Sequence, residues 1–261
     1  MQKYGNRILT RQKRIGQQKY NNNGELMEIV DYKNSRDITI KFEDGTIMNN
    51  VNYWNFMNGR VKKYNRPNKY NKGVNTVNDG SRTKEYSLWD GIMNRCFSNN
   101  KKVQSPSYLN VTCCNEWLDY KTFCEWLHSQ SNWEKCRDGE KWAIDKDIIR
   151  KGNKIYSPLY CCLVPHNVNS LFTKHDRARG LYPIGVTKKK TDKYFTSRCN
   201  DPFNNKTILH YGFATPEDAF MQYKKDKEMI IKKVAQSEYD KGNITLDCYK
   251  AMLNYMVEIT D

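Results

Sequence analysis

Apolar and polar residues alternate over residues 37–43, which is the period expected of a β-strand with one buried face. Asp44 and Gly45 come next, a pair typical of tight hairpin turns because glycine accepts a positive φ. A second run of strand-forming residues begins at Thr46. The pattern therefore predicts a β-hairpin in this part of the chain.

An earlier strand is predicted over residues 24–30, and its alternation allows two orientations. It buries either Met27 and Ile29 or Leu26 and Val30. With the hairpin it predicts a small β module over residues 1–62 that carries a basic N-terminal arm and has the size of an SH3-like barrel. Residues 63–84 are rich in Asn, Lys and Gly, so we expect a linker there.

Two amphipathic helices are predicted further along, over residues 85–97 and 116–128, because their apolar residues recur at helical spacing. Their expected core positions are Tyr86, Trp89, Ile92, Met93, Cys96 and Phe97 in the first helix and Trp117, Tyr120, Phe123, Cys124 and Leu127 in the second.

The pattern changes after the second helix. A short strand is predicted over residues 141–148, with Asp145 and Asp147 at its end. A turn leads to a second short strand over residues 161–165, and a helix is expected to begin near His166.

A further group of strands follows, at residues 184–186, 193–199 and 207–213. The next helix has a clear start signal: Thr215 is a suitable N-cap and proline occupies the first helical position. Another helix is expected within residues 237–261, packed on the rest as a cap.

Charge adds a candidate partner to this picture. Lys and Arg outnumber Asp and Glu by 44 to 29 in 261 residues, a formal net charge of +15. The excess is concentrated in residues 1–84, with 17 basic and 7 acidic side chains, and in residues 171–214, with 9 and 3. Clustered charge of one sign indicates a polyanion as partner.

The sequence lacks the patterns that are typical of membrane-spanning and secreted proteins. There is no run of about 18 apolar residues that could span a membrane, and residues 1–16 lack the apolar core of a secretory signal. Nine cysteines, an odd number, are then expected to be reduced thiols in the cytoplasm. They include no C-x-x-C pair, so they offer no convincing zinc site.

The segment over residues 141–172 resembles the HNH endonuclease family, especially its phage and homing-type members. The resemblance rests on a strand that ends in an acidic pair, a second strand, and a helix that carries an asparagine. It implies a ββα-metal fold in which Asp145 binds a divalent metal such as Mg²⁺ and Asn169 completes the metal site.

Two residues depart from that family's pattern. Lys146 stands where the family has its general-base histidine, and Tyr160 stands where it has the asparagine that orients the histidine. A lysine between Asp145 and Asp147 is expected to stay protonated and cannot take a proton from water. The three positions that match catalytic residues, Lys146, Asp147 and Tyr160, therefore form a degenerate site. If that site is inactive, it would not need a metal ion. The charge of Lys146 is then expected to lie beside a bound phosphate.

Residues 180–236 resemble the AP2 or integrase-type DNA-binding domain. The resemblance rests on Gly185-Val186, a basic run, a Tyr-Phe-x-Ser-Arg strand, and a Tyr-Gly-Phe strand end before Thr-x-Glu-Asp-Ala. It implies a three-stranded sheet, backed by one helix, that enters the major groove of double-stranded DNA. The nucleic-acid-binding residues it implies are Arg177, Arg179, Lys188, Lys189, Lys190, Lys193, Tyr194 and Arg198.

The expected fold class is therefore α+β. The expected domains are an N-terminal β module (1–62), a linker (63–84), an HNH-like core with helices (85–178), an AP2-like domain (179–236) and a helical cap (237–261).

Three functions fit these expectations. The first is a phage-type DNA-binding protein with a degenerate nuclease site, which would act in the host cytoplasm. The second is an active Mg²⁺-dependent nickase or homing-type endonuclease. The third is an anti-defence protein that inhibits a host defence protein through this scaffold.

Overall fold

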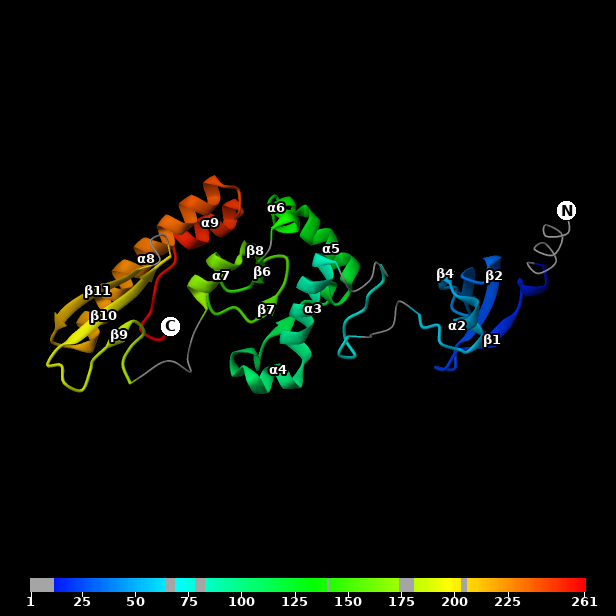
Figure 1. The fold of residues 1–261 in the computed structure, drawn as a ribbon, viewed down its shortest axis with the longest axis horizontal. Helices are drawn as coiled ribbons and strands as arrows, with labels where there is room; N and C mark the ends of the chain where they lie inside the picture. Colours follow the sequence, from blue (N-terminus) through cyan, green and yellow to red (C-terminus); the bar gives the residue numbers. More distant parts are fainter. Residues whose placement is uncertain (1–11, 64–68, 78–82, 140, 174–180, 203–205) are drawn as a thin grey trace. The chain divides into compact units, whose positions relative to one another are not determined.

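The computed structural model describes residues 12–63, 69–77, 83–139, 141–173, 181–202 and 206–261 (Figure 1). The chain divides into two compact units, one formed by residues 1–68 and 74–78 and the other by residues 69–73 and 79–261. Helices and strands are mixed along the chain, so the expected α+β class is confirmed. None of the helices in these ranges is both long enough and apolar enough to cross a membrane.

The first unit contains a four-stranded antiparallel sheet in sequence order, β1 (Gln18–Tyr20), β2 (Leu26–Asn34), β3 (Asp37–Phe42) and β4 (Ile47–Val51). Of the two orientations open to β2, the structure has Met27 and Ile29 buried. They share a core with Phe56 of α2 (Tyr53–Met57). β1 lies in the N-terminal region where a basic arm was expected. This region therefore also contributes an edge strand to the sheet.

The second unit begins with a helical part. It contains α3 (Lys84–Phe97), α4 (Asn99–Gln104), the 3₁₀ turn η1 (Pro106–Tyr108), the short strand β5 (Thr112–Cys113), the 3₁₀ turn η2 (Glu116–Leu118), α5 (Tyr120–Ser129) and α6 (Trp133–Asp138). The second helix expected from spacing is interrupted at Asp119, whose side chain caps α5. The aromatic residues Trp89, Trp117, Tyr120 and Phe123 form the core as predicted.

Part of the expected linker packs on this helical part. Gly73 lies so close to Trp89 that a Cβ atom there would approach the indole to 2.8 Å. Lys69 forms an ion pair with Asp90, and the hydroxyl of Tyr70 lies 3.2 Å from Oδ1 of Asn94. Residues 69–73 are therefore anchored to α3.

The acidic pair belongs to a small ββα element. β6 (Trp142–Asp145) pairs antiparallel with β8 (Cys162–Pro165), and α7 (His166–Phe172) follows directly. β7 (Ile155–Tyr156), which lies between them in sequence, pairs instead in parallel with β5.

The last sheet has the order β11 (Lys206–Phe213), β10 (Phe195–Asp201), β9 (Val186–Thr187), and all pairs are antiparallel. α8 (Pro216–Asp240) lies along this sheet, and α9 (Leu246–Leu253) packs on α8 (Figure 1). The predicted start of α8 is confirmed, because the hydroxyl of Thr215 accepts a hydrogen bond from the Asp218 amide.

One apolar core joins the ββα element to the last sheet and its helices. Val164 of β8 and Val168 of α7 belong to the same buried cluster as Val186 of β9 and Ile231 of α8. The amide of Asn132 also donates to the carbonyls of Leu163 and Asn243, both at 2.8 Å. The expected domain boundaries at 178/179 and 236/237 stay predictions, and both fall inside this second unit.

Candidate nucleic-acid interface and acidic turn

α8 covers one face of the three-stranded sheet, and side chains on the other face, such as Arg198, Leu209 and Tyr211, are exposed. Ser197 and Cys199 of β10 alternate toward the helix and are buried. The residues that alternate with them on β10, which are Thr196, Arg198 and Asn200, point away from α8 together with their register partners on the adjoining strands. We call this surface the open face; it consists of Thr187, Thr196, Arg198, Asn200, Thr207, Leu209 and Tyr211.

The open face combines hydrogen-bonding groups with exposed apolar surface. Arg198 is exposed and stands opposite Leu209, and Tyr211 stands opposite Thr196 with 73% of its surface exposed. The hydroxyl of Thr207 donates to Oδ1 of Asn200 at 3.0 Å, which fixes the amide of Asn200 on this face. Such a surface can donate to base edges and phosphates and can also touch apolar groups.

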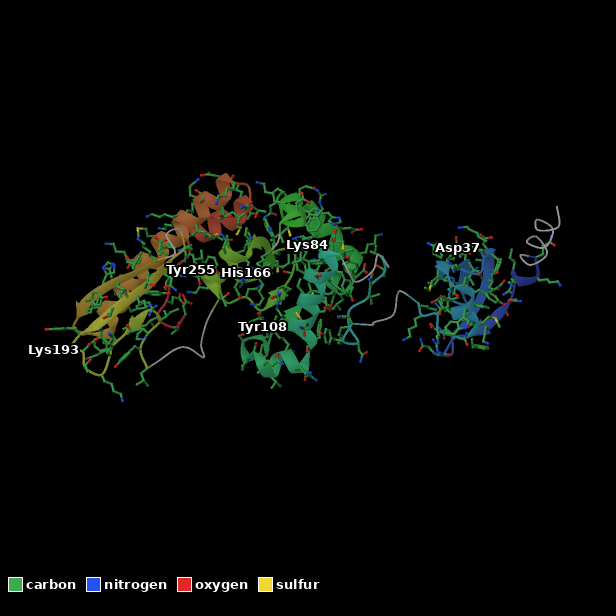
Figure 2. All side chains as sticks on the ribbon, in the orientation of Figure 1. Asp37, Lys84, Tyr108, His166, Lys193 and Tyr255 are labelled. Atoms are coloured by element: carbon green, nitrogen blue, oxygen red, sulfur yellow. The ribbon has the colours of Figure 1, made fainter. Side chains whose placement is uncertain are left out.

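The expected lysines flank the open face. Lys188, Lys189, Lys190 and Lys193 lie in the connection between β9 and β10, where Figure 2 labels Lys193. Nζ of Lys188 lies 4.4 Å from the centre of the Phe195 ring, so this ammonium lies near the start of β10. Tyr194 is exposed, with the ammonium of Lys193 at 5.4 Å from its ring centre.

The other expected nucleic-acid contacts, Arg177 and Arg179, lie outside the described residues. Leu209, Tyr211, Asn200 and Thr207 were not predicted as site residues. For Thr207, Leu209 and Tyr211 the signal was present in the alternation of residues 207–213, and for Asn200 in the alternation that runs on from Arg198, since every second residue of a strand faces the same side.

The acidic pair at the end of β6 forms a tight turn. Oδ1 of Asp145 accepts hydrogen bonds from the backbone amides of Asp147 at 2.6 Å and Ile148 at 2.8 Å. Burial raises the pKa of Asp145 above its usual value, and these two amide bonds oppose the rise. Asp145 therefore shapes the turn that presents residues 146 and 147.

Lys146 is enclosed within this turn, and only 6% of its surface is exposed. Its ammonium donates to Oδ2 of Asp147, and its carbonyl accepts a hydrogen bond from the amide of Asn153 at 2.9 Å. Instead of facing outward to a bound phosphate, the buried lysine pairs its charge with the carboxylate of Asp147, whose side chain is 43% exposed.

The remaining expected site residues do not contact Lys146. The hydroxyl of Tyr160 accepts a hydrogen bond from Nη1 of Arg150 at 3.0 Å, and the guanidinium lies 5.2 Å from the Tyr160 ring centre. Asn169 lies half-buried on α7, and its carbonyl accepts from the Thr173 hydroxyl at 3.1 Å. Tyr160 thus orients an arginine at the turn rather than residue 146.

Within the described ranges, no cluster of three or more His, Cys, Asp or Glu side chains is arranged for a metal ion. Mg²⁺ sites can use only one or two carboxylates when phosphate oxygens complete the coordination. Asp147 is already neutralised by Lys146, so Asp145 and the side-chain oxygen of Asn169 are the groups that would hold such an ion.

A segment distant in sequence lies close to the acidic turn. Tyr255, labelled in Figure 2, packs edge-on against Phe172 with ring centres 4.8 Å apart. Lys151 donates to the carbonyl of Met256 at 2.8 Å and to Asp261 at 2.7 Å. Burial, followed by the carboxylates of Asp261, Asp147 and Asp145, raises the pKa of Tyr255. No local sequence pattern signals this contact.

All nine cysteines are free thiols in the structure. Burial raises the pKa of Cys96 to about 12 and the pKa values of Cys136 and Cys199 to about 11. Because the thiolate is the reactive form, these buried groups are poor nucleophiles at neutral pH.

Comparison with known proteins gave no relatives: no family model, curated protein or solved structure matches this chain significantly.

Proposed function

We propose that the protein binds double-stranded DNA through the open face of the β9–β10–β11 sheet, as the AP2-type resemblance implies. One observation carries the proposal: α8 covers one side of the sheet, while the other side presents Arg198 and Tyr211 to solvent. A two- or three-stranded sheet of this size fits the major groove, which is about 12 Å wide.

The lysines beside the sheet supply the electrostatic part of this binding. Their ammonium groups would neutralise phosphates and release counterions, which gives affinity without sequence preference. Arg198 would add the base-edge contact, since a guanidinium can donate two parallel hydrogen bonds to guanine.

The test is fluorescence anisotropy with a labelled duplex, measured over a range of salt concentrations. We expect replacement of Lys188, Lys189 and Lys190 by Ala to weaken binding and to reduce the slope of log affinity against log salt by about 0.9 for each phosphate that the protein no longer neutralises. Arg198→Ala combined with Tyr211→Ala should weaken binding with a smaller change in slope.

The matched control is Lys121→Ala, which removes one exposed positive charge from α5, away from this sheet. It should leave the affinity and the salt slope nearly unchanged. If the folded open-face and lysine variants bind duplex DNA as tightly as the unaltered protein, the sheet is not the DNA-binding surface.

For the ββα element we propose a site of HNH descent that does not cleave DNA. The antiparallel β6 and β8, followed directly by α7 with Asp145 at the end of β6, support the descent. Inactivity follows from Lys146, because its ammonium is paired with Asp147 and cannot accept a proton from water.

The same ββα arrangement keeps an active nickase as the second candidate. A plasmid-nicking assay with Mg²⁺ separates the two. We expect no nicking by the unaltered protein and a gain of Mg²⁺-dependent nicking in Lys146→His that Asp145→Ala then removes. Robust nicking by the unaltered protein, abolished in Asp145→Ala, would establish the nickase instead.

A further inference from the structure

A second charged surface runs along the side of α8 that faces away from the sheet. Its residues are spaced so that they share one side of the helix. We call it the α8 stripe; it consists of Met221, Lys224, Lys225, Glu228, Met229, Lys232 and Lys233. The opposite side of α8 is buried in the core through residues such as Phe220, Ile231 and Val234.

The stripe has apolar surface among its charges. Met221 has 59% and Met229 43% of its surface exposed, although most large apolar side chains of α8 are buried. These residues line a shallow hollow of about 560 Å³. Exposed methionines with freely rotating thioethers are common at surfaces that adapt to a partner.

The lysines of the stripe are not equivalent. Lys224 is already occupied, since its ammonium donates to Glu228 and to the carbonyl of Val257, both at 2.6 Å. Glu228 in turn accepts from the Val257 amide at 2.8 Å. Within the described part of the chain, no carboxylate lies within ion-pair distance of Lys225, Lys232 or Lys233. The stripe therefore carries four lysines and one carboxylate, an excess of positive charge around two methionines.

We propose that the α8 stripe docks an acidic amphipathic segment of another protein. Acidic side chains of that segment would pair with Lys225, Lys232 and Lys233, and its apolar side chains would cover Met221 and Met229. Charge complementarity selects an anionic partner, and the methionines favour a peptide over DNA because a peptide can cover them with large apolar side chains, whereas the outside of a duplex presents mainly phosphates.

This surface is separate from the proposed DNA site. α8 lies between the two, since its buried side packs on the sheet and the stripe is on its outer side. The protein could therefore hold a DNA duplex and an acidic protein segment together, and each contact can be removed without the other.

The experiment titrates the full chain with a fluorescent synthetic helix-forming peptide that carries two leucines two turns apart among glutamates. Two matched peptides carry serines in place of the leucines or glutamines in place of the glutamates. We expect the first peptide to bind and each matched peptide to bind roughly tenfold more weakly.

The variants assign the surface. Lys232→Glu with Lys233→Glu, and separately Met221→Ser with Met229→Ser, should each lower peptide affinity roughly tenfold and leave duplex DNA affinity unchanged. All four side chains are exposed, so their replacement should not disturb the core, and circular dichroism should show a folded protein. Arg198→Ala serves as the control and should leave peptide affinity unchanged.

Three results would overturn the proposal. The first is peptide binding that the stripe variants do not alter. The second is a loss of duplex DNA affinity in the lysine pair, which would make the stripe a nucleic-acid surface. The third is a dimer of the unaltered protein that the methionine pair dissociates, which would make a second copy the occupant. Failure of DNA binding through the open face would leave the peptide titrations and the dimer measurement unaffected, so the two proposals can fail separately.

Discussion

Lys146 is the residue on which the proposed absence of nuclease activity rests. Under the proposed HNH descent it stands where a general base would be, and its ammonium lies inside the turn against Asp147. The substitution itself could be recognised from the sequence. Its enclosure could not, because the side chains that enclose it include Tyr156, whose ring centre lies 6.0 Å from Nζ.

The buried position of Lys146 makes it a stability residue. We expect Lys146→Ala to lower the free energy of unfolding of the second unit by about 1–2 kcal/mol, because Asp147 loses its partner but keeps access to water. Lys146→Met, which retains most of the side-chain stem, should cost less. Urea denaturation followed by circular dichroism measures both, and equal losses would show that the side-chain stem contributes nothing and that the ion pair accounts for the whole effect.

Asp44, at the hairpin turn of the first unit, is a residue with a marked pH response. The hydrogen bond from Lys63, aided by the amide of Thr46, lowers the pKa of Asp44 from 3.8 to about 2. Because the folded-state pKa is the lower one, this stabilisation is complete above pH of about 4 and is lost as the pH falls toward 2.

Replacing Lys63 by Met should therefore raise the pKa of Asp44 toward its usual value. Carbon-detected NMR of labelled aspartate side chains reads the titration directly, and Asp31 serves as an internal reference on the same sheet. An unchanged Asp44 titration in the variant would assign the low pKa to the turn amides instead of Lys63.

At the scale of elements, the periodicity of the sequence predicted features that depend only on neighbouring residues. Strands, helices and even the inward residues of α3 follow from spacing in the sequence, because burial on one side imposes a period of two or about 3.6 residues. Non-local features were not predictable in this way. The interruption at Asp119 and the parallel pairing of β5 with β7 depend on which segments the fold brings together.

Two glycines in the β9–β10–β11 region allow the energetic cost of backbone strain to be measured separately from the cost of a steric clash. Gly185 and Gly212 both have positive φ, at +75° and +92°, but a Cβ at Gly185 would overlap the Tyr223 ring, whereas Gly212 has open space. Gly212→Ala should cost about 1–2 kcal/mol from the backbone alone. Gly185→Ala should cost clearly more, because α8 must move away from the sheet.

Thermal unfolding of the two variants, followed by circular dichroism, measures the difference. Gly185→Ala should also weaken DNA binding, since the sheet loses its support. Equal midpoints for the two variants would contradict the close packing of Tyr223 on the backbone at Gly185.

For the whole molecule, the sequence indicates where the chain changes character but not which parts share a core. The resemblance of residues 180–236 to an AP2-type domain suggested a domain boundary at residue 179. In the structure, Val164 and Val168 on one side of it are buried with Ile231 on the other. Tyr255 likewise reaches the acidic turn from far along the chain, and no pattern within either segment could show that contact.

Because the ββα element and the last sheet share one core, a destabilising substitution in the first is expected to destabilise the second as well. Val164→Ala should lower the free energy of unfolding of the second unit by about 2 kcal/mol. In hydrogen exchange, amides of β10 should lose protection together with those of β8, although the substitution is in β8. Amides of β2 and β3, which belong to the first unit, should exchange as before. Protection that falls in β8 while β10 is unaffected would mean that the two parts open independently.

The amide of Asn132, which joins the carbonyls of Leu163 and Asn243, has a consequence for engineering. A chimeric protein that takes residues 179–261 from another source would inherit neither a matching surface for Val164 and Val168 nor the carbonyl at residue 243. The sheet proposed to bind DNA is therefore not a separable module. An exchange of binding specificity is better made by substituting the open face, residue by residue, on the existing strands.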